Sequence, residues 1–350
     1  MLGNLRLNNA LRKPLQEPGE LVRSVGGNVE LWINLVVLSG ALVFLVWQGT
    51  GFAIVVGTVF AIWAILAVSL NLLIGYTGLL SIAHVGFFGV GAYAMAILTT
   101  EATREQVPGH IGTPDLPFFA ALPVSMVLAG VVALFVGGVL SRFRDDLFVL
   151  VSFGFAIISF SVFLNWRPVS RGPFGIHEIV KPTIGGWQID GKLEFLLLTL
   201  VFLGLVMLIS WFIASSSYGR VLTAIREDEQ AIEVFGYRAS YYKLSIWVIS
   251  AMMAGLAGAL FSSWTSFIDP INFQLLESIL MVAIVILGGL ATIWGSLLGA
   301  LVFVLLNEAM RFVPFLPTEF IGQARQIVLG ILLVLLMLFR PQGLVGRYKL

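Results

Sequence analysis

Long runs of apolar residues without any charge dominate this chain. The longest covers residues 31–100 and contains no Asp, Glu, Lys or Arg. A helix needs about 20 residues to cross the hydrocarbon core of a bilayer, so this run has room for three membrane helices. We expect them at 31–48, 52–75 and 80–99, separated by polar, glycine-containing stretches at 48–51 and 75–78.

Further apolar runs follow along the rest of the chain. Uncharged runs cover 116–141, 147–166, 195–219, 244–268 and 278–307, and a last apolar run covers 327–339. These runs are apolar on all sides and lack the alternation of transmembrane β-strands. They predict an all-α, polytopic helical membrane protein with about 8–10 membrane segments.

The run 278–307 has an unusual length, too long for one untilted crossing and too short for two full ones. Gly288, Gly289 and Gly295 interrupt it. A broken or re-entrant helix pair near 278–307 is therefore predicted, because interrupted helices occur at transporter binding sites. The alternative is one long, tilted helix with a glycine kink.

Composition supports a membrane location and excludes several classes of function. Hydrophobic residues make up 59% of the chain and charged residues 11%, against about 25% charged residues in soluble proteins. This excludes a water-soluble enzyme. The absence of cysteine excludes thiol catalysis and thiolate metal sites, and we predict no catalytic or metal site. A net charge of +1 argues against nucleic acid as a partner.

The distribution of Lys and Arg predicts the orientation in the membrane. The N-terminal tail, residues 1–30, carries four positive charges and is expected in the cytoplasm. The positive segments 215–243 and 341–350 share that side if 278–307 contributes an even number of crossings. The membrane domain then covers 31–340, between an N-terminal and a C-terminal cytoplasmic tail. The loop 167–194 is an exception, because its four positive residues fall outside.

One polar segment, 218–238, has the pattern of an amphipathic helix. Apolar positions recur at helical spacing at Leu222, Ile225, Ile232 and Phe235. Gly236 is placed where a glycine would end the helix. Its four acidic residues oppose docking on anionic lipid, so we expect the helix to lie in a groove of a soluble partner.

This segment, GRVLTAIREDEQAIEVFGYR, resembles the cytoplasmic coupling segment of ABC importer permeases of the branched-chain amino acid, LivM-type family. Three more stretches are similar to blocks of that family: NLLIGYTGLLSIAHVGFFGVGAYAMAIL (71–98), VILGGLATIWGSLLGALVFVLLNE (285–308) and LFRPQGLVGR (338–347). The resemblance implies a permease subunit of the bacterial inner membrane for branched-chain or other hydrophobic amino acids. It also implies four partners: a second related permease, two cytoplasmic ATPases and an external binding protein.

The resemblance assigns ATPase coupling to particular residues of the segment, namely Gly219, Arg220, Leu222, Ile225, Arg226, Glu227, Glu229, Ile232 and Gly236. No cofactor is expected in this chain, and ATP is expected on the partner subunits. A near-match to a phosphate-binding loop ends in Leu193 where Ser or Thr is required, so no ATPase activity is expected here. Two departures from the family pattern are Arg171, in place of a glycine, and the uncharged stretch 151–160.

Four polar residues of the membrane region are candidates for the substrate path: Asn71, Tyr76, Thr77 and His84. The first three alternatively cap helix ends. His84 is either hydrogen-bonded to a neighbouring helix or part of a proton relay. Two other functions remain open at this point: an ABC permease for urea, short amides or nucleosides, and a proton-coupled secondary transporter.

Overall fold

The computed structural model describes residues 49–100, 116–141, 145–184, 187–311, 321–339 and 343–345. All of them belong to one compact unit, Leu45–Leu350. The helix expected at 31–48 and the N-terminal tail lie outside the described residues.

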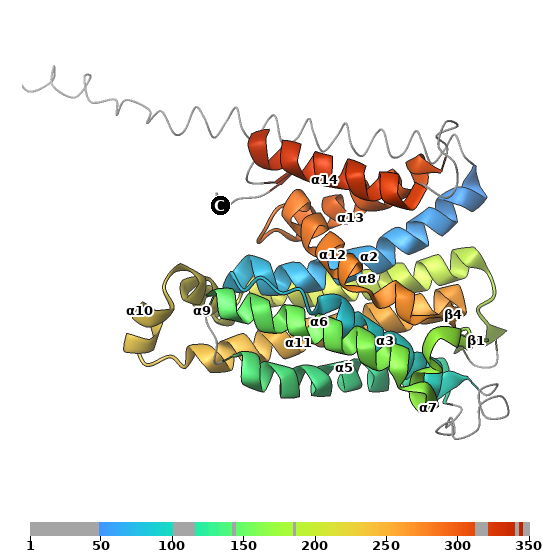
Figure 1. The fold of residues 1–350 in the computed structure, drawn as a ribbon, viewed down its shortest axis with the longest axis horizontal. Helices are drawn as coiled ribbons and strands as arrows, with labels where there is room; N and C mark the ends of the chain where they lie inside the picture. Colours follow the sequence, from blue (N-terminus) through green and yellow to red (C-terminus); the bar gives the residue numbers. More distant parts are fainter. Residues whose placement is uncertain are drawn as a thin grey trace, which may run out of the picture. The chain divides into compact units, whose positions relative to one another are not determined.

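The described chain is a helical bundle (Figure 1). Its helices are α2 Thr50–Thr77, α3 His84–Thr99, α5 Phe118–Leu140, α6 Asp145–Asn165, α7 Arg167–Ser170, α8 Lys192–Ser215, α9 Ser217–Glu227, α10 Glu229–Val234, α11 Ala239–Thr265, α12 Leu275–Gly288, α13 Ile293–Met310 and α14 Ile321–Phe339. Its short strands and 3-10 turns are β1 Ile176–His177, β2 Thr183–Ile184, β3 Trp187–Gln188, β4 Phe267–Ile268, η1 Gly172–Phe174 and η2 Pro270–Phe273.

The expectation of a helical membrane protein is confirmed. Among the described residues, α2, α5, α8, α11, α13 and residues 147–165 of α6 are long and apolar enough to cross a membrane. The helices α3 and α12 and a part of α14 are apolar but shorter. These six candidate crossings are fewer than the predicted 8–10 segments, and the three shorter apolar helices come in addition to them among the described residues.

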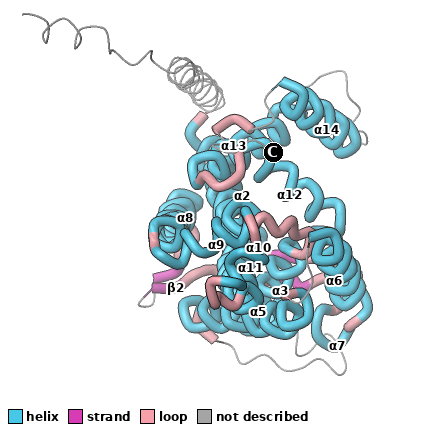
Figure 2. The backbone as a smooth tube through the Cα atoms, turned by 90° about the vertical axis from the view of Figure 1, so that its left-hand side faces the viewer, coloured by secondary structure: helices cyan, strands magenta, loops and turns pink. Residues whose placement is uncertain are grey.

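The centre of the bundle is formed by α2, α3 and α11, with α5, α6 and α8 around them (Figure 2). In the most apolar part of α11, 67% of the residues are buried, against 22% in α8. The α3–α11 crossing is close because it is built from glycine: a Cβ on Gly91 would overlap Gly255, and one on Gly258 would overlap the Phe88 carbonyl. Such small-residue contacts allow membrane helices to approach each other closely.

Two ends of the bundle carry different elements (Figure 1). At one end lie α9, α10 and the last turn of α2. At the other end β1 pairs with β4 and β2 pairs with β3, both antiparallel. Because β1 and β4 flank α8–α11 in the sequence, this pairing places residues 176–177 and 267–268 at the same end.

The segment 278–307 consists of two helices, so the alternative of a single tilted helix is wrong. The helix α12 ends at Gly288, α13 begins at Ile293, and residues 289–292 form the connection, which we call the α12–α13 break. Gly288 packs against Gly295, and Gly299 packs against the Ile284 carbonyl. This register makes α12 and α13 an antiparallel hairpin, in which glycines permit the close contact.

Candidate functional site

The segment 218–238 folds into two helices, and the prediction of one continuous helix is wrong. The helix α9 is capped by Ser216, whose hydroxyl accepts a hydrogen bond from Gly219 N at 3.2 Å. Asp228 is extended, with φ −156°, and separates α9 from α10. Its carboxylate accepts hydrogen bonds from Gln230 N at 2.9 Å and Ala231 N at 3.0 Å. An aspartate that caps the next helix interrupts the one before it.

Gly236 ends the segment as expected. It has φ 88°, a conformation that favours glycine. Its N–H donates to the Glu233 carbonyl at 3.0 Å, and Tyr237 N donates to Ile232 O at 3.3 Å. Hydrogen bonds that close back over the last turn are typical of a helix C-terminus with a left-handed residue. No atom lies within 4 Å of the position that a Cβ would occupy, so the backbone conformation alone calls for glycine.

The apolar stripe of the segment does not face outward, and its expected contact with a partner needs correction. Leu222 is fully buried and Ile225 is 4% exposed, because α9 packs on α2, α8 and α11 of its own chain. Ile232 is partly exposed. The exposed apolar residues come later: Val234 is 86% exposed and Phe235 is 77% exposed. Sequence reasoning placed Phe235 on the stripe but did not single out this pair as the free surface.

The charged residues predicted for coupling divide between internal contacts and solvent. Arg226 Nη1 donates to the carbonyl of Gly75, in the last turn of α2, at 2.6 Å. Glu229 pairs with Lys243 of α11 at 2.5 Å, and that lysine is 2% exposed. Arg220 donates to Ser217 of its own helix, and Glu227 is exposed. Arg226 and Glu229 therefore fix the segment to the bundle, while Arg220 and Glu227 do not.

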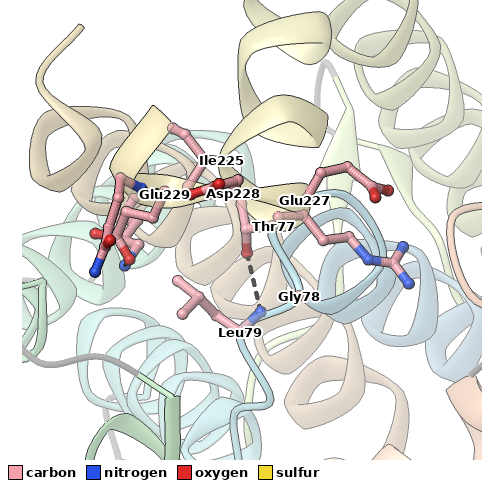
Figure 3. A pocket seen from close by; sticks show the side chains of 10 residues that line it. Thr77, Gly78, Leu79, Ile225, Glu227, Asp228 and Glu229 are labelled. Atoms are coloured by element: carbon pink, nitrogen blue, oxygen red, sulfur yellow. Dashed lines mark hydrogen bonds and ion pairs between the residues drawn. The ribbon is translucent and has the colours of Figure 1, made fainter. Parts of the chain in front are cut away.

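A polar cavity of about 300 Å³ lies where α9, α10 and the end of α2 meet (Figure 3). Its lining residues are Thr77, Gly78, Leu79, Ile225, Arg226, Glu227, Asp228, Glu229, Gln230 and Lys243. At the start of α9, the Tyr218 hydroxyl lies 2.5 Å from Ser245 Oγ. Burial raises the pKa of the Tyr218 phenol above its ordinary value, so this contact between α9 and α11 remains a bond between neutral groups at physiological pH.

Two of the substrate-path candidates are brought together on the α12–α13 break. The Asn71 amide nitrogen donates to Thr292 O at 2.8 Å and lies 2.7 Å from Ser296 Oγ. Its oxygen accepts from Ala291 N at 3.0 Å. Tyr76 Oη donates to Ala291 O at 3.4 Å. Asn71 and Tyr76 thus hold another element and do not cap their own helix.

The other two candidates lie apart from this cluster. Thr77 Oγ1 donates to Leu73 O at 2.7 Å and accepts from Leu79 N at 3.3 Å, so it caps the end of α2. His84 is the first residue of α3, is 1% exposed, and has its Nε2 2.7 Å from Ser69 Oγ of α2. The hydrogen bond to a neighbouring helix that was expected for His84 is present. A role of these four residues in the substrate path stays a prediction.

Residues 343–345 also contact the α12–α13 break, and the sequence did not predict this contact. Leu344 N donates to Leu287 O at 2.9 Å, and Val345 N donates to Gly288 O at 3.0 Å. The last carbonyls of a helix lack partners within it, and residues 343–345 supply them. Gly343, at φ 78°, lies so close that a Cβ would be 2.7 Å from Gly289 Cα. Gly343 belongs to the LFRPQGLVGR block, but nothing in that block indicated its contact with the α12–α13 break.

Comparison with known proteins identifies the chain. The family model described as "Branched-chain amino acid transport system / permease component" matches residues 52–337. The chain belongs to this permease family. It is a permease component of a branched-chain amino acid ABC transport system, a multi-pass membrane subunit that is itself not catalytic.

Individual relatives agree with this membership. The permease is 33% identical over 336 residues to the high-affinity branched-chain amino acid transport system permease protein LivM of Escherichia coli (strain K12). This alignment covers 89% of this chain and 73% of the relative. It is 32% identical to LivM of Salmonella typhimurium, with the same coverage. It is 25% identical to LivH of Escherichia coli (strain K12), covering 81% of this chain and 91% of the relative. No solved structure matches.

One departure from the family pattern has a structural correlate in this permease. Arg171, where a glycine was expected, has φ 59° and ends α7 in the left-handed region. Glycine adopts this conformation without strain, whereas other residues are disfavoured there by about 1 kcal/mol. The second departure, the absence of charge in 151–160, falls within α6, whose exposed residues here are apolar.

Proposed function

We propose that this permease pairs with a second, related permease in the bacterial inner membrane and imports branched-chain or other hydrophobic amino acids. Two cytoplasmic ATPases bind and hydrolyse the ATP, and an external protein delivers the substrate. This chain needs no cofactor of its own. Membership in a family of ABC permeases disfavours the alternative of a proton-coupled secondary transporter.

The observation that carries this proposal is the exposed apolar pair at the end of α10, its last residue Val234 and the following Phe235. Val234 and Phe235 project from a segment that is otherwise fixed to the bundle by buried Leu222 and by the Glu229–Lys243 ion pair. An exposed apolar pair on a short, anchored helix is a suitable anchor for a groove on a soluble partner. We assign the α9–α10 end of the bundle to the cytoplasm and the docking contact to this pair.

The test is Phe235→Asp in the complete complex. A buried aromatic anchor contributes about 2 kcal/mol or more, so the affinity of the ATPases should fall roughly 30-fold. Ile271→Asp is the matched control, because Ile271 is 63% exposed and lies at the opposite end, in η2. Co-purification of ATPase with both variants to the same extent as with wild type would refute docking at α10.

The cargo follows from a separate measurement. The names of two relatives, LivM and BraD, specify high-affinity branched-chain amino acid transport, whereas RbsC, 22% identical, is a ribose permease. Equilibrium binding of leucine, isoleucine and valine to the external protein encoded with this permease should exceed binding of urea, acetamide and nucleosides. Preference for one of the latter would establish the alternative cargo.

The hairpin of α12 and α13 fits the orientation that we propose. If both helices cross the membrane, the segment contributes an even number of crossings, as the positive-inside pattern requires. A re-entrant pair, which enters and leaves on one side, satisfies the same count. In either arrangement residues 341–350 lie on the cytoplasmic side together with α9 and α10.

A further inference from the structure

The end of α2 lies between the coupling segment and the α12–α13 break and contacts both. Arg226 of α9 donates to Gly75 O at 2.6 Å. This carbonyl belongs to the last turn of α2, where carbonyls lack a partner within the helix and a cation is favourable. The Arg226 stem also covers Gly78, since a Cβ there would be 3.0 Å from Arg226 Cγ. A displacement of α9 would therefore act directly on this turn.

The same turn of α2 contacts the break. A Cβ on Gly75 would lie 2.5 Å from Ala291 N, so the two backbones touch at this residue. One turn earlier, Asn71 makes three hydrogen bonds to Ala291, Thr292 and Ser296. Because Asn71 is 2% exposed, these bonds are shielded from water and hold the break in register with α2.

The break has one side-chain hydrogen bond of its own, from Thr292 Oγ1 to Gly289 O at 3.1 Å, and its conformation also depends on its surroundings. Gly289 has φ 118° and Ala291 has φ 59°, and the carbonyls before it are satisfied by residues 344 and 345. A non-glycine residue in the left-handed region persists where its surroundings impose it. Here Asn71 supplies that constraint, because it accepts the hydrogen bond from Ala291 N. Displacement of α2 would thus change the geometry of the break.

We propose that Arg226 and Asn71 are positioning residues that transmit the movement of α9, through the last two turns of α2, to the α12–α13 break. This inference rests on the proposed function, in which ATP moves the coupling segment. The helix α10 is fixed separately, through Glu229 and Lys243, to α11. A continuous set of polar contacts from α9 to the α12–α13 hairpin passes through α2.

Removal of the first contact should uncouple transport without loss of the ATPases. Arg226→Met keeps the apolar stem over Gly78 and removes the hydrogen bond to Gly75 O. We expect uptake per ATP hydrolysed to fall about tenfold, the scale of a typical coupling free energy, while ATPase co-purification stays at the wild-type level. Lys192→Met is the control, because it removes the same charge from an exposed residue at the start of α8, at the end of the bundle away from α9.

Removal of the second contact should have the same consequence. Asn71→Leu abolishes the three hydrogen bonds between Asn71 and residues 291–296. If this variant fails to assemble, Ser296→Ala takes its place in the test, because it removes one of the three bonds. The double variant of Arg226→Met with either substitution should be no worse than the more impaired single variant, because both interrupt one route. Additive losses in uptake per ATP would show two independent effects and overturn the proposal.

A distance measurement separates transmission from mere stabilisation. Spin-label pairs on introduced cysteines, Gln230 with Ile271 and Trp294 with Ile271, report α10 and the start of α13 relative to the opposite end, and all three residues are exposed. ATP should change both distances in the wild-type complex and only the Gln230 distance in Arg226→Met. An unchanged Trp294 distance in wild type, or a changed one in Arg226→Met, would overturn the inference. Failure of the wild-type chain to bind ATPases would instead refute the proposed function on which it rests.

Discussion

His84 lies buried at the start of α3, where its Nε2 is 2.7 Å from Ser69 Oγ. We expect this contact to be structural, with no proton transfer to the transport cycle. His84→Gln retains a hydrogen-bonding group and cannot titrate near neutral pH, so ATP-driven uptake should remain close to wild type. His84→Leu should lower the free energy of unfolding by about 1 kcal/mol, because Ser69 Oγ loses its hydrogen bond with His84 and keeps the one that it donates to Leu66 O.

Uptake by reconstituted complexes, measured over a range of external pH, checks the prediction for His84. If His84→Gln abolishes uptake while the complex assembles and hydrolyses ATP, the histidine takes part in transport and the structural interpretation is wrong.

Gly258 is a second residue whose role follows from its surroundings. A Cβ at this position would overlap the Phe88 carbonyl of α3, so Gly258→Ala should separate α3 from α11 and destabilise the permease by about 1–3 kcal/mol. Gly204→Ala is the control, because no atom lies within 4 Å of its Cβ position in α8. That variant should be neutral or slightly more stable. Thermal unfolding in detergent would contradict the packing argument if both variants behaved alike.

The identity of a residue predicted what kind of contact it makes, but it did not predict which residue it contacts. Gly91, Gly255 and Gly258 form the close contact between α3 and α11, and glycine is the residue that permits such an approach. Asn71 looked like a residue of a polar path or a cap, but it binds the α12–α13 break more than 200 positions away in sequence. A contact of that separation depends on how the helices assemble, and no local pattern encodes it.

At the scale of elements, the coupling segment shows what an amphipathic pattern can and cannot establish. The spacing of Leu222, Ile225 and Ile232 indicated a helix with one apolar face. It did not indicate whether that face is covered by the protein itself or by a partner, because both surfaces are apolar. The structure buries Leu222 and Ile225 internally and leaves Val234 and Phe235 exposed.

Asp228 provides a test of the division into α9 and α10. Its carboxylate accepts hydrogen bonds from Gln230 N and Ala231 N, and loss of an N-terminal cap costs about 1 kcal/mol. In Asp228→Ala the amide hydrogens of residues 229–235 should therefore exchange roughly fivefold faster. Glu227→Ala is the control, since it removes a neighbouring exposed carboxylate that caps neither helix. Equal exchange rates in the two variants would show that α10 does not depend on this cap.

At the scale of the whole molecule, charge and length predicted the helical architecture and the interruption of 278–307. The excess of glycine at 288–289 marked where α12 ends. The sequence did not indicate that residues 343–345 return to this point, because the hydrogen bonds involved are made by backbone groups and any residue can supply them. This return places the C-terminal segment at the same end of the bundle as the last turn of α2 and α9.

The arrangement of the two ends makes a prediction for orientation in the cell membrane. Ser240, in the first turn of α11, and Lys349, four positions after Val345 in the sequence, should face the cytoplasm. Asp269, which caps η2 at the opposite end, and Asp115, which lies outside the described residues, should face outward. The chain has no cysteine, so single cysteines at these four positions are clean probes. A membrane-impermeant thiol reagent should label only positions 115 and 269 on intact spheroplasts, and all four after permeabilisation. Labelling of position 349 on intact spheroplasts would place the C-terminal tail outside. The segment 278–307 would then contribute an odd number of crossings. A hairpin of α12 and α13 that returns to the side from which it started is incompatible with that result.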